Sequence, residues 1–464
     1  MEKQGIRPAF ALGGLPLLFF LLAVFTSGAQ DANYWTQQYG AYSNLLGGSV
    51  IGSVSDLSAV YYNPGRLSIN DTSAFIISAK AYQYRVIVVE DASGEGSRVS
   101  NPFISGSPDL VAGNLPVKKL FGRSCRMAYS FLQRYQGEFD VVGRNAFRAD
   151  VLPDQNGAEF FAGEAKFEYK INDFWAGVTW STALSPRWGV GITQFISVRS
   201  QRWDQRILYE ALIQNGNTAT ANRFQDMRYN AYSLVWRLGL SGDLGPWRLG
   251  LSVTTPYARL FGSGNVLYNE LLAGGDQSND LLVADQQLKQ KARWRSPWSV
   301  GLGGSLDISS SARIHLSAEW FSAVKGYDLI DTEPFTGQSN DATYTHRVFA
   351  SREMVLNGAV GVEFSPENRF RYYGSFATDF SAVPQSTAAS VFAPIGSDLY
   401  HLGAGTSARL GRIDLNLGLV FSFGASDIPP FTSVYVPPGW GLDSENVARI
   451  SVQRIKLIFG LTLI

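Results

Sequence analysis

Apolar and polar side chains alternate along the last residues of the chain. At positions 455–463 every odd-numbered residue is apolar, whereas Arg454 and Lys456 occupy even-numbered positions. Segments 412–423 and 312–320 alternate in the same way. Because successive side chains of a strand point to opposite faces, each segment is predicted to be a β-strand with one apolar and one polar face.

The lengths of these strands and of their connections indicate which kind of β protein this is. The alternating segments run for about ten or more residues, enough to cross a bilayer at a tilt, whereas strands of soluble sheets average about five or six. Outer-membrane barrels have tight turns at one end and long loops at the other. Short connections are predicted at 184–187, 243–246, 308–311, 365–369 and 410–411, and long loops at 204–228, 261–290, 325–346, 381–398 and 424–446. The sequence therefore predicts an all-β fold, a transmembrane antiparallel β-barrel, which must be closed because lipid offers no partners to a strand edge.

The predicted barrel has fourteen strands, an even number that places both ends of the chain on the periplasmic side. Residues 138–149 and 159–170 both resemble strands, and parity allows only one full crossing between 136 and 170. The strands are predicted at 73–89, 124–135, one between 136 and 170, 174–184, 187–203, 229–243, 247–260, 291–307, 312–324, 347–364, 370–381, 399–410, 412–424 and 447–464.

Composition narrows the class of protein. The 464-residue chain has 39 Lys+Arg against 39 Asp+Glu, a formal net charge of zero, so it lacks the basic excess of a nucleic-acid-binding protein. Charged residues make up 17% of the chain, against about 25% in an ordinary soluble domain. Beyond the N-terminal segment no apolar run approaches the roughly 18 residues that a membrane-spanning helix needs. These properties exclude a nucleic-acid partner and a helical membrane protein, and they are typical of a barrel.

The first 29 residues are predicted to be a secretory signal peptide. Lys3 and Arg7 precede a short apolar stretch, and Ser27-Gly28-Ala29 supplies the small residues of a cleavage site. An uncleaved membrane anchor is the alternative, but no stop-transfer flank follows. We therefore expect the mature chain to reach the outer membrane and to be inserted by the barrel-insertion machinery, although the last strand does not end in an aromatic residue.

Residues 30–72 do not alternate and are predicted to form a plug, or hatch, in the lumen, with the barrel itself at 73–464. Asn63, Pro64 and Gly65 favour a tight turn, because Pro fixes φ and Gly tolerates positive φ. A disordered tail is the alternative interpretation, but the segment carries too many apolar and aromatic residues for one.

The sequence around this turn resembles the FadL family of outer-membrane transport proteins. That family has small residues, an Asp and an apolar pair before Asn-Pro-Ala-Gly-Leu. The matching residues in this chain are Asp56, Ala59, Val60, Tyr61, Tyr62, Asn63, Pro64 and Leu67. Gly65 and Arg66 depart from the Ala and Gly that are commonest in the family. Weaker similarities lie at 252–256, 295–303 and 400–405.

The resemblance implies a monomeric fourteen-stranded barrel whose hatch lies in the lumen. It implies the passive uptake of hydrophobic small molecules, such as long-chain fatty acids or aromatic hydrocarbons, through an apolar lumen pocket and a lateral opening in the wall. Such a route spares a hydrophobic solute from hydration. Asn63, Pro64 and Gly65 would shape the hatch turn beside the wall, with an ordinary turn as the alternative. The sequence assigns neither the pocket residues nor the strand that opens.

Motifs for catalysis and metal binding are absent from the sequence. It contains no nucleophile elbow and no zinc-protease motif, so we expect no enzyme activity, no cofactor and no metal site. Cys125 is the only cysteine, which excludes an intramolecular disulfide and a Cys-based zinc site. His315, His346 and His401 are far apart in the sequence. Their convergence in a barrel esterase or phospholipase stays open, although lumen hydrogen bonding is the simpler interpretation.

Two other non-enzymatic functions stay open. A hydrophilic porin would explain a polar inner face but not an apolar plug. A PorV-like barrel, a distant relative of FadL, would bind secreted protein cargo or a protein partner at the barrel mouth. For uptake, the expected ligands are hydrophobic small molecules or lipid. In either function the barrel is expected to contact the lipid of the outer membrane.

Overall fold

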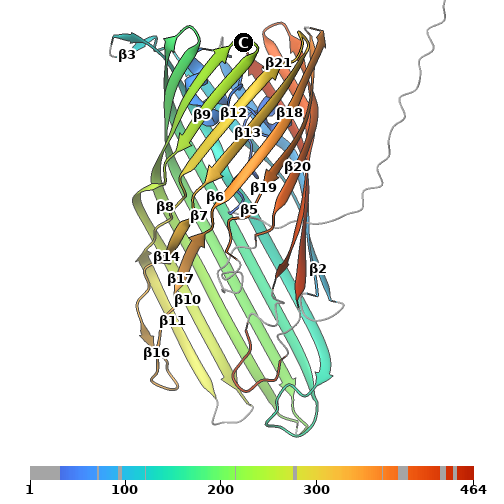
Figure 1. The fold of residues 1–464 in the computed structure, drawn as a ribbon. Helices are drawn as coiled ribbons and strands as arrows, with labels where there is room; N and C mark the ends of the chain where they lie inside the picture. Colours follow the sequence, from blue (N-terminus) through green and yellow to red (C-terminus); the bar gives the residue numbers. More distant parts are fainter. Residues whose placement is uncertain are drawn as a thin grey trace, which may run out of the picture.

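The chain forms a closed β-barrel with its N-terminal segment inside (Figure 1). The computed structural model describes residues 32–69, 73–91, 97–120, 122–214, 216–274, 280–367, 369–384, 396–428, 435–442 and 447–464. The predicted signal peptide, residues 1–29, lies outside the described residues.

The barrel wall is one antiparallel sheet. Its strands are β1 (Phe75–Glu90), β2 (Arg98–Leu115), β5 (Arg126–Ala149), β6 (Glu159–Ser185), β7 (Trp188–Leu212), β8 (Thr218–Leu244), β9 (Trp247–Thr254), β10 (Ala258–Ala273), β11 (Leu281–Lys291), β12 (Ser299–Asp307), β13 (Ala312–Phe321), β18 (Val355–Glu367), β19 (Phe370–Asp379), β20 (Leu399–Leu410), β21 (Ile413–Ile428) and β22 (Ala448–Leu463). Strand β8 pairs with β10 along one half and with β9 along the other, which closes the sheet. Strands β9 and β10 are halves of one crossing, as are β11 and β12, so fourteen strands cross and the predicted fold class is confirmed.

The remaining elements are short. They are the helices α1 (Ala41–Leu45) and α2 (Ala59–Tyr62), the 3₁₀ helix η1 (Pro64–Ser68), and the strands β3 (Lys119–Leu120), β4 (Arg123–Ser124), β14 (Val324–Ile330), β15 (Phe335–Thr336), β16 (Thr343–Tyr344) and β17 (Val348–Arg352). No helix in the described part of the chain combines the length and the apolar character needed to cross a membrane.

The strand count was predicted correctly through two opposite errors. Strand β2 at 98–115 was missed, whereas the three strands predicted within 124–184 are in fact two, β5 and β6. Pro102 and Pro108 interrupt the alternation of β2, and both lie where β2 pairs only with β1 and not with β5. Proline is tolerated there because its missing N–H faces no partner strand.

The predicted long loops at 204–228 and 261–290 are wrong, because strands occupy most of them. Strands β6 and β8 each contain 27 residues, whereas a barrel strand crosses a bilayer in about 9–11 residues. At about 3.3 Å per residue such strands are roughly 90 Å long. We call the end of the barrel with the tight turns, at 184–187, 243–246, 308–311 and 410–411, the short-turn half, and the opposite end the far half. The wall formed by β5 to β8, β10 and β11 continues far beyond the short-turn half, as the lower part of Figure 1 shows.

The polarity of the wall reverses along these long strands. In the short-turn half of β7, Arg199 faces inward and is buried, while its neighbour Val198 is 43% exposed on the outside. In the far half Tyr209 faces inward and is buried, while its neighbour Glu210 is exposed. An apolar exterior suits lipid and a charged exterior suits water, so only the short-turn half has the surface of a membrane-embedded barrel.

Two apolar cores fill the lumen. Residues 32–69 are buried almost throughout. The part from Tyr39 to Leu67 forms one core with the short-turn half of the wall, and this core includes Leu45, Val60 and Phe195. The start of the plug, including Tyr34 and Trp35, belongs to the second core. The second core lies in the far half and includes Phe161 and Tyr209. The fold therefore has a plug in the lumen, as predicted.

Candidate functional site

Asn63, Pro64 and Gly65 lie where the plug touches the wall. The Asn63 Nδ2 donates hydrogen bonds to the carbonyl oxygens of Ile51 and Leu240, both at 2.9 Å, and its Oδ1 accepts one from the Gly65 N–H at 3.1 Å. The side chain thus joins two parts of the plug to β8 and caps the 3₁₀ helix η1. The predicted turn is therefore also a docking contact.

Glycines on both sides allow the backbones to approach closely at this contact. A Cβ atom added to Gly65 would lie 2.5 Å from the Gly189 carbonyl oxygen and 2.7 Å from that of Gly239. A Cβ on Gly191 would lie 2.5 Å from the Pro64 carbonyl oxygen. Strands β7 and β8 therefore pack against η1 at a distance that no residue with a side chain permits.

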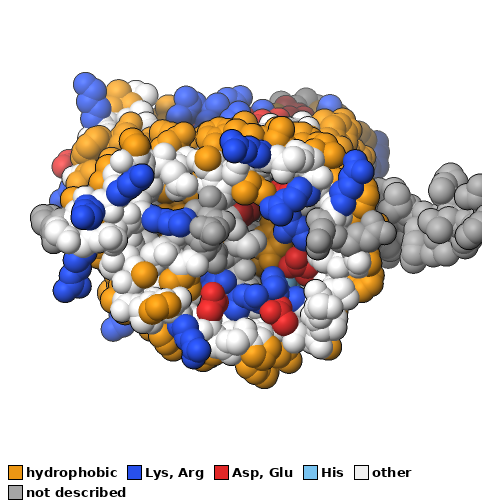
Figure 2. Space-filling view, turned by 90° about the horizontal axis from the view of Figure 1, so that it is seen from above, with side chains coloured by type: hydrophobic (Ala, Val, Ile, Leu, Met, Phe, Trp, Pro, Cys, Tyr) orange, Lys and Arg blue, Asp and Glu red, His pale blue; other side chains and the backbone are white. Residues whose placement is uncertain are grey.

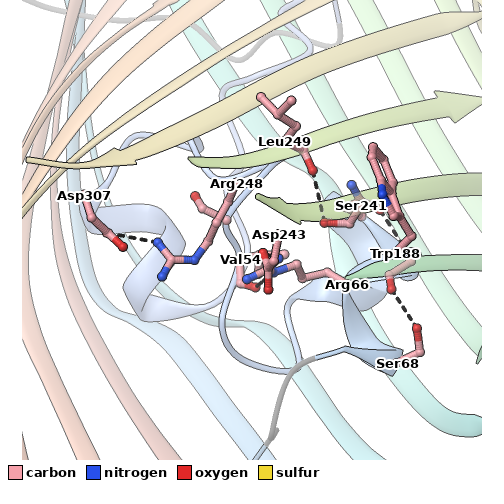
Figure 3. Close-up of polar contacts among 12 residues, drawn as sticks. Val54, Arg66, Ser68, Trp188, Ser241, Asp243, Arg248, Leu249 and Asp307 are labelled. Carbon is pink, nitrogen blue, oxygen red and sulfur yellow. Dashed lines mark hydrogen bonds and ion pairs between the residues drawn. The ribbon is translucent and has the colours of Figure 1, made fainter. Parts of the chain in front are cut away.

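Ion pairs close the short-turn end of the lumen (Figure 3). Arg66 of the plug donates to Asp243 of β8 and, through Nε, to the Val54 carbonyl oxygen at 3.3 Å. Beside it Arg248 pairs with Asp307 at 3.0 Å. Seen from this end, Lys and Arg side chains surround the mouth of the barrel and Asp and Glu side chains lie among them (Figure 2). Among the described residues, this end of the lumen therefore carries paired charges.

An aromatic pocket lies deeper, between the plug and the wall, and its cavity has a volume of about 40 Å³. The plug, β5 and β6 supply part of its lining, and the segments between β9 and β10 and between β11 and β12 supply another part. Residues of β8, β9, β12 and β13 complete it. Its aromatic side chains are Tyr34, Tyr61, Tyr135, Trp175, Tyr257, Trp294 and Phe321. Neighbouring rings are in contact: the ring centroids of Trp175 and Tyr257 are 5.9 Å apart, and those of Tyr34 and Phe321 are 4.4 Å apart. We call this set the aromatic pocket.

Buried charges surround the aromatic pocket. Arg237 lies 3.2 Å from the Glu319 carboxylate, and Arg199 lies 3.6 Å from that of Asp173. The Arg134 guanidinium lies over the Tyr135 ring at 4.6 Å and donates to a plug carbonyl oxygen at 3.1 Å. The contact with Arg134 restrains the Tyr135 ring, because cation–π contacts strengthen where water is excluded.

A larger hollow of about 850 Å³ lies on the outer face of the wall and is separate from the aromatic pocket. Its rim carries Leu302 and Leu316, which are 61% and 57% exposed. Small residues, among them Gly304, Ala318 and Gly358, form its floor. This hollow faces the surroundings of the barrel, so it is no part of the lumen route.

The wall is interrupted at the seam between β2 and β5, next to the aromatic pocket. These strands pair only from Leu110 opposite Leu132 to Leu115 opposite Met127, although both strands continue well beyond that point. Beyond the paired stretch, β5 has an irregularity between Gln133 and Tyr135. Arg134 and Tyr135 lie at that irregularity, and both also line the aromatic pocket. The unpaired seam therefore borders the pocket directly.

A second interruption separates β9 from β10 and β11 from β12. Tyr257 lies in the first break, where its hydroxyl donates to the Asp173 carboxylate at 2.9 Å. Trp294 lies in the second break, where the Arg199 guanidinium lies 3.6 Å from its ring centroid. The weak family similarities at 252–256 and 295–303 coincide with these breaks and with the pocket lining.

Solved structures share this architecture over almost the whole chain. The toluene transporter TodX of Pseudomonas putida aligns with a TM-score of 0.54 at 12% identity, covering 92% of this chain and 98% of its own. The toluene transporter TbuX of Ralstonia pickettii has a TM-score of 0.51 at 12% identity and covers 92% and 99%. A Pseudomonas aeruginosa FadL homologue has a TM-score of 0.52 at 12% identity and covers 94% and 98%. The chain has the FadL fold. No protein-family model and no curated protein matches it.

Two departures from the FadL turn pattern fit the local structure of this barrel. Gly65 stands where the family commonly has Ala, and here β7 and β8 leave no space for a methyl group. Arg66 stands where the family commonly has Gly, and here it pairs with Asp243. The function of the turn itself remains a prediction.

The histidines of this FadL-like barrel do not converge on one site. The His315 Nδ1 lies 2.7 Å from the Ser53 Oγ, and the His401 Nδ1 lies 2.7 Å from the Ser422 Oγ. Each ring also faces a carboxylate across its other nitrogen. Both serines are at most 1% exposed, so neither hydroxyl lies at an open surface in this structure. His346 lies elsewhere, 4.0 Å from the Tyr268 ring.

The sequence did not reveal the aromatic pocket. Tyr257 and Trp294 lie outside regular strands, and Trp175 faces inward from a strand in which aromatic residues occupy both faces. Alternation cannot assign such positions to the lumen or to lipid. A useful signal was proline: Pro256 lies between β9 and β10, and Pro297 lies between β11 and β12, where the wall strands break.

Proposed function

We propose that the protein is an outer-membrane channel for the passive uptake of hydrophobic small molecules, such as long-chain fatty acids or compounds of similar character. The aromatic pocket carries this proposal, because aromatic side chains bind apolar solutes and few polar atoms are needed to orient them. Proteins of the same fold include TodX and TbuX, described as toluene transporters, and CymD, described as a monoaromatic hydrocarbon channel.

An outer-membrane location is supported by the exterior of the short-turn half. Leu302, Leu316, Leu417 and Leu419 are each more than half exposed there. Such a continuous apolar band suits lipid and would be a liability in water. The tryptophans Trp247 and Trp298, which are 50% and 49% exposed, suit the interfaces of that band.

Ligand binding requires the aromatic pocket to widen. An apolar cavity of roughly 150 Å³ holds benzene, whereas the cavity here measures about 40 Å³. Tyr257 and Trp294 lie in the strand breaks rather than in paired strands, so their displacement disrupts no ladder hydrogen bonds. We infer that they move when a ligand binds.

We propose the β2–β5 seam as the lateral opening. Strand pairing stops there beside the pocket, and polar contacts made by Asn101 and Arg85 bridge it. The Asn101 Nδ2 donates to the Asp140 carbonyl oxygen at 2.5 Å, and Arg85 of β1 donates to the Glu138 carbonyl oxygen. The unpaired stretch begins beyond Leu110 and Leu132, at the border of the short-turn half, so a ligand that leaves at that end of the seam passes from aromatic side chains to the edge of the apolar exterior.

The test of uptake uses a variant that fills the pocket. Ser296 lines the pocket, and Ser296→Trp should block uptake of radiolabelled toluene and oleate by cells that produce the full chain as their only channel of this kind. Ser309→Trp, in an exposed short turn, is the matched control and should leave uptake unchanged. If both variants take up both compounds at the parent rate, the pocket does not carry the function.

The route is tested separately. Asn101→Cys with Asp140→Cys, in a Cys125→Ser background, places a thiol on each side of the seam for a short bis-maleimide. Cross-linking should slow uptake while toluene still binds the purified protein. Unchanged uptake after cross-linking would reject the seam. If no hydrophobic compound binds or enters, the alternative of a PorV-like barrel for secreted protein cargo gains support instead.

A further inference from the structure

Four basic side chains gather on the lumen face of β1 and β22. Lys80 and Arg85 belong to β1 and Arg454 and Lys456 to β22, and each is at most 4% exposed. Arg85 lies directly opposite Arg454 in the ladder between these strands. Lys80 and Arg454 both lie near enough to Lys456 to repel it. Like charges that face each other on neighbouring strands destabilise a sheet.

The two lysines of this basic cluster contact only neutral groups of the plug. Lys80 donates to the side-chain oxygen of Gln37. Lys456 donates to the carbonyl oxygen of Thr36 at 2.7 Å. Neither lysine forms an ion pair with a carboxylate among the described residues. Both ammonium groups are therefore buried without a carboxylate in direct contact among the described residues.

The two arginines of the basic cluster leave some of their N–H groups without a hydrogen-bond acceptor among the described residues. Arg85 donates to the Glu138 carbonyl oxygen, but its Nε has no acceptor in the described part of the chain. The Glu138 carboxylate pairs with Lys170 instead, at 3.2 Å. Arg454 has no acceptor for either Nε or Nη1 among the described residues. These two buried N–H-bearing nitrogens of Arg454, a residue that is 4% exposed, point to a ligand group, because buried charges are ordinarily paired.

The neighbouring carboxylates are engaged by neutral donors. Asp109 accepts from the Asn44 Nδ2 at 2.7 Å, and Asp379 accepts from the Trp35 N–H at 2.8 Å and the Thr36 hydroxyl at 2.5 Å. These two carboxylates act on the cluster through space without contacting it. The Glu138 carboxylate also acts on Arg85, but Lys170 balances its charge, so four positive and two negative charges leave the basic cluster with an excess of two.

We propose that the basic cluster of Lys80, Arg85, Arg454 and Lys456 is a binding site for phosphate, either the free ion or the monoester headgroup of a lipid. A phosphate group with two negative charges balances the excess of two positive charges, whereas a single carboxylate would leave one positive charge unbalanced. Its oxygens accept the N–H groups that Arg85 and Arg454 leave unpaired, and guanidinium groups match phosphate geometry. The site is separate from the aromatic pocket and does not depend on the uptake proposal.

The test is the thermal unfolding of the purified full chain in a non-ionic detergent. Inorganic phosphate should raise the unfolding temperature above its value in chloride at the same ionic strength. Phosphatidic acid in mixed micelles is the second probe. A shift with phosphate identifies the free ion as sufficient, and a shift with phosphatidic acid alone identifies the lipid as the source. No shift with either probe overturns the proposal.

Variants separate ligand binding from simple attachment of the plug. Arg454→Gln should weaken phosphate binding, measured by titration calorimetry, by about tenfold or more, the loss expected for a hydrogen bond between charged groups. In chloride the same variant should be at least as stable as the parent, because it no longer repels Arg85. Arg454→Gln being less stable in both buffers, or retaining the phosphate shift, would contradict the proposal. Lys456→Gln repeats the test if Arg454→Gln fails to fold, and Arg313→Gln, whose parent arginine pairs with Asp307, is the control that keeps the shift.

Discussion

Gly65→Ala should loosen the plug from the wall. The new methyl group would lie 2.5 Å and 2.7 Å from two strand carbonyl oxygens, whereas carbon and oxygen ordinarily approach to about 3.3–3.6 Å. The plug and β7 must therefore separate by several tenths of an ångström. Overpacking of this kind costs typically 1–3 kcal/mol. A loss of about 2 kcal/mol would raise the population of the undocked plug about 30-fold, since each 1.4 kcal/mol is a factor of ten.

Hydrogen exchange of the plug amides measures this population directly. The amides of 50–63 should exchange about 30-fold faster in Gly65→Ala if they exchange through undocking, while the amides of β21 and β22 keep the parent rate. Gly358→Ala is the matched control, because the nearest atom to its added methyl group is 3.9 Å away. Equal exchange in the parent and both variants would refute the close-packing argument at Gly65.

Three further predictions follow from other contacts. Arg66→Met and Asp243→Asn should each destabilise the plug, and a double-mutant cycle by hydrogen exchange should show a coupling of about 1 kcal/mol, because the pair is only partly shielded from solvent; additive effects would show that the ion pair contributes nothing. Ser53→Ala and Ser422→Ala should leave p-nitrophenyl ester hydrolysis at the background level of the parent, because both hydroxyls are buried; an activity lost in either variant would indicate an esterase. Burial lowers the pKa of His346 to about 4, so its neutral form stabilises the surrounding segment above about pH 6.5, and this contribution is lost as the pH falls toward 4. Relative to its rate on an unstructured peptide at the same pH, trypsin should cleave the parent at Arg347 faster at pH 5 than at pH 7.5, and a His346→Phe variant with the same pH response would reject this origin.

The sequence predicted the barrel because lipid imposes a simple rule on its strands. In 454–464 and 412–423 one face is apolar and the other polar, so alternation alone identifies them. The same rule fails in β5 and β6, where the far halves carry charged residues outside and aromatic residues inside. It also fails in β2, whose prolines suggest a turn. In each case the environment of the strand changes along its length, and a pattern based on one environment divides or omits it.

The candidate site was less accessible to sequence reasoning than the fold. The turn at Asn63 was found because its residues have strong local preferences, and the structure adds its contact with the wall. The aromatic pocket depends on residues from the plug and from strands far apart in the sequence, such as Tyr34 and Trp294. The basic cluster depends on the pairing of β1 with β22, the first and last strands of the wall. Contacts of this kind follow from closure of the barrel and have no local signature.

The reversal of polarity along the long strands has a consequence for assembly. If β7 shifted by one residue against its neighbours, Val198 would turn inward and Arg199 outward in the short-turn half. The same shift would place Glu210 in the far core and Tyr209 in water. Both halves of each strand therefore oppose the same misalignment, one through lipid and the other through water. A chain inserting strand by strand has two independent checks on its alignment, and an error that escapes the first is penalised by the second.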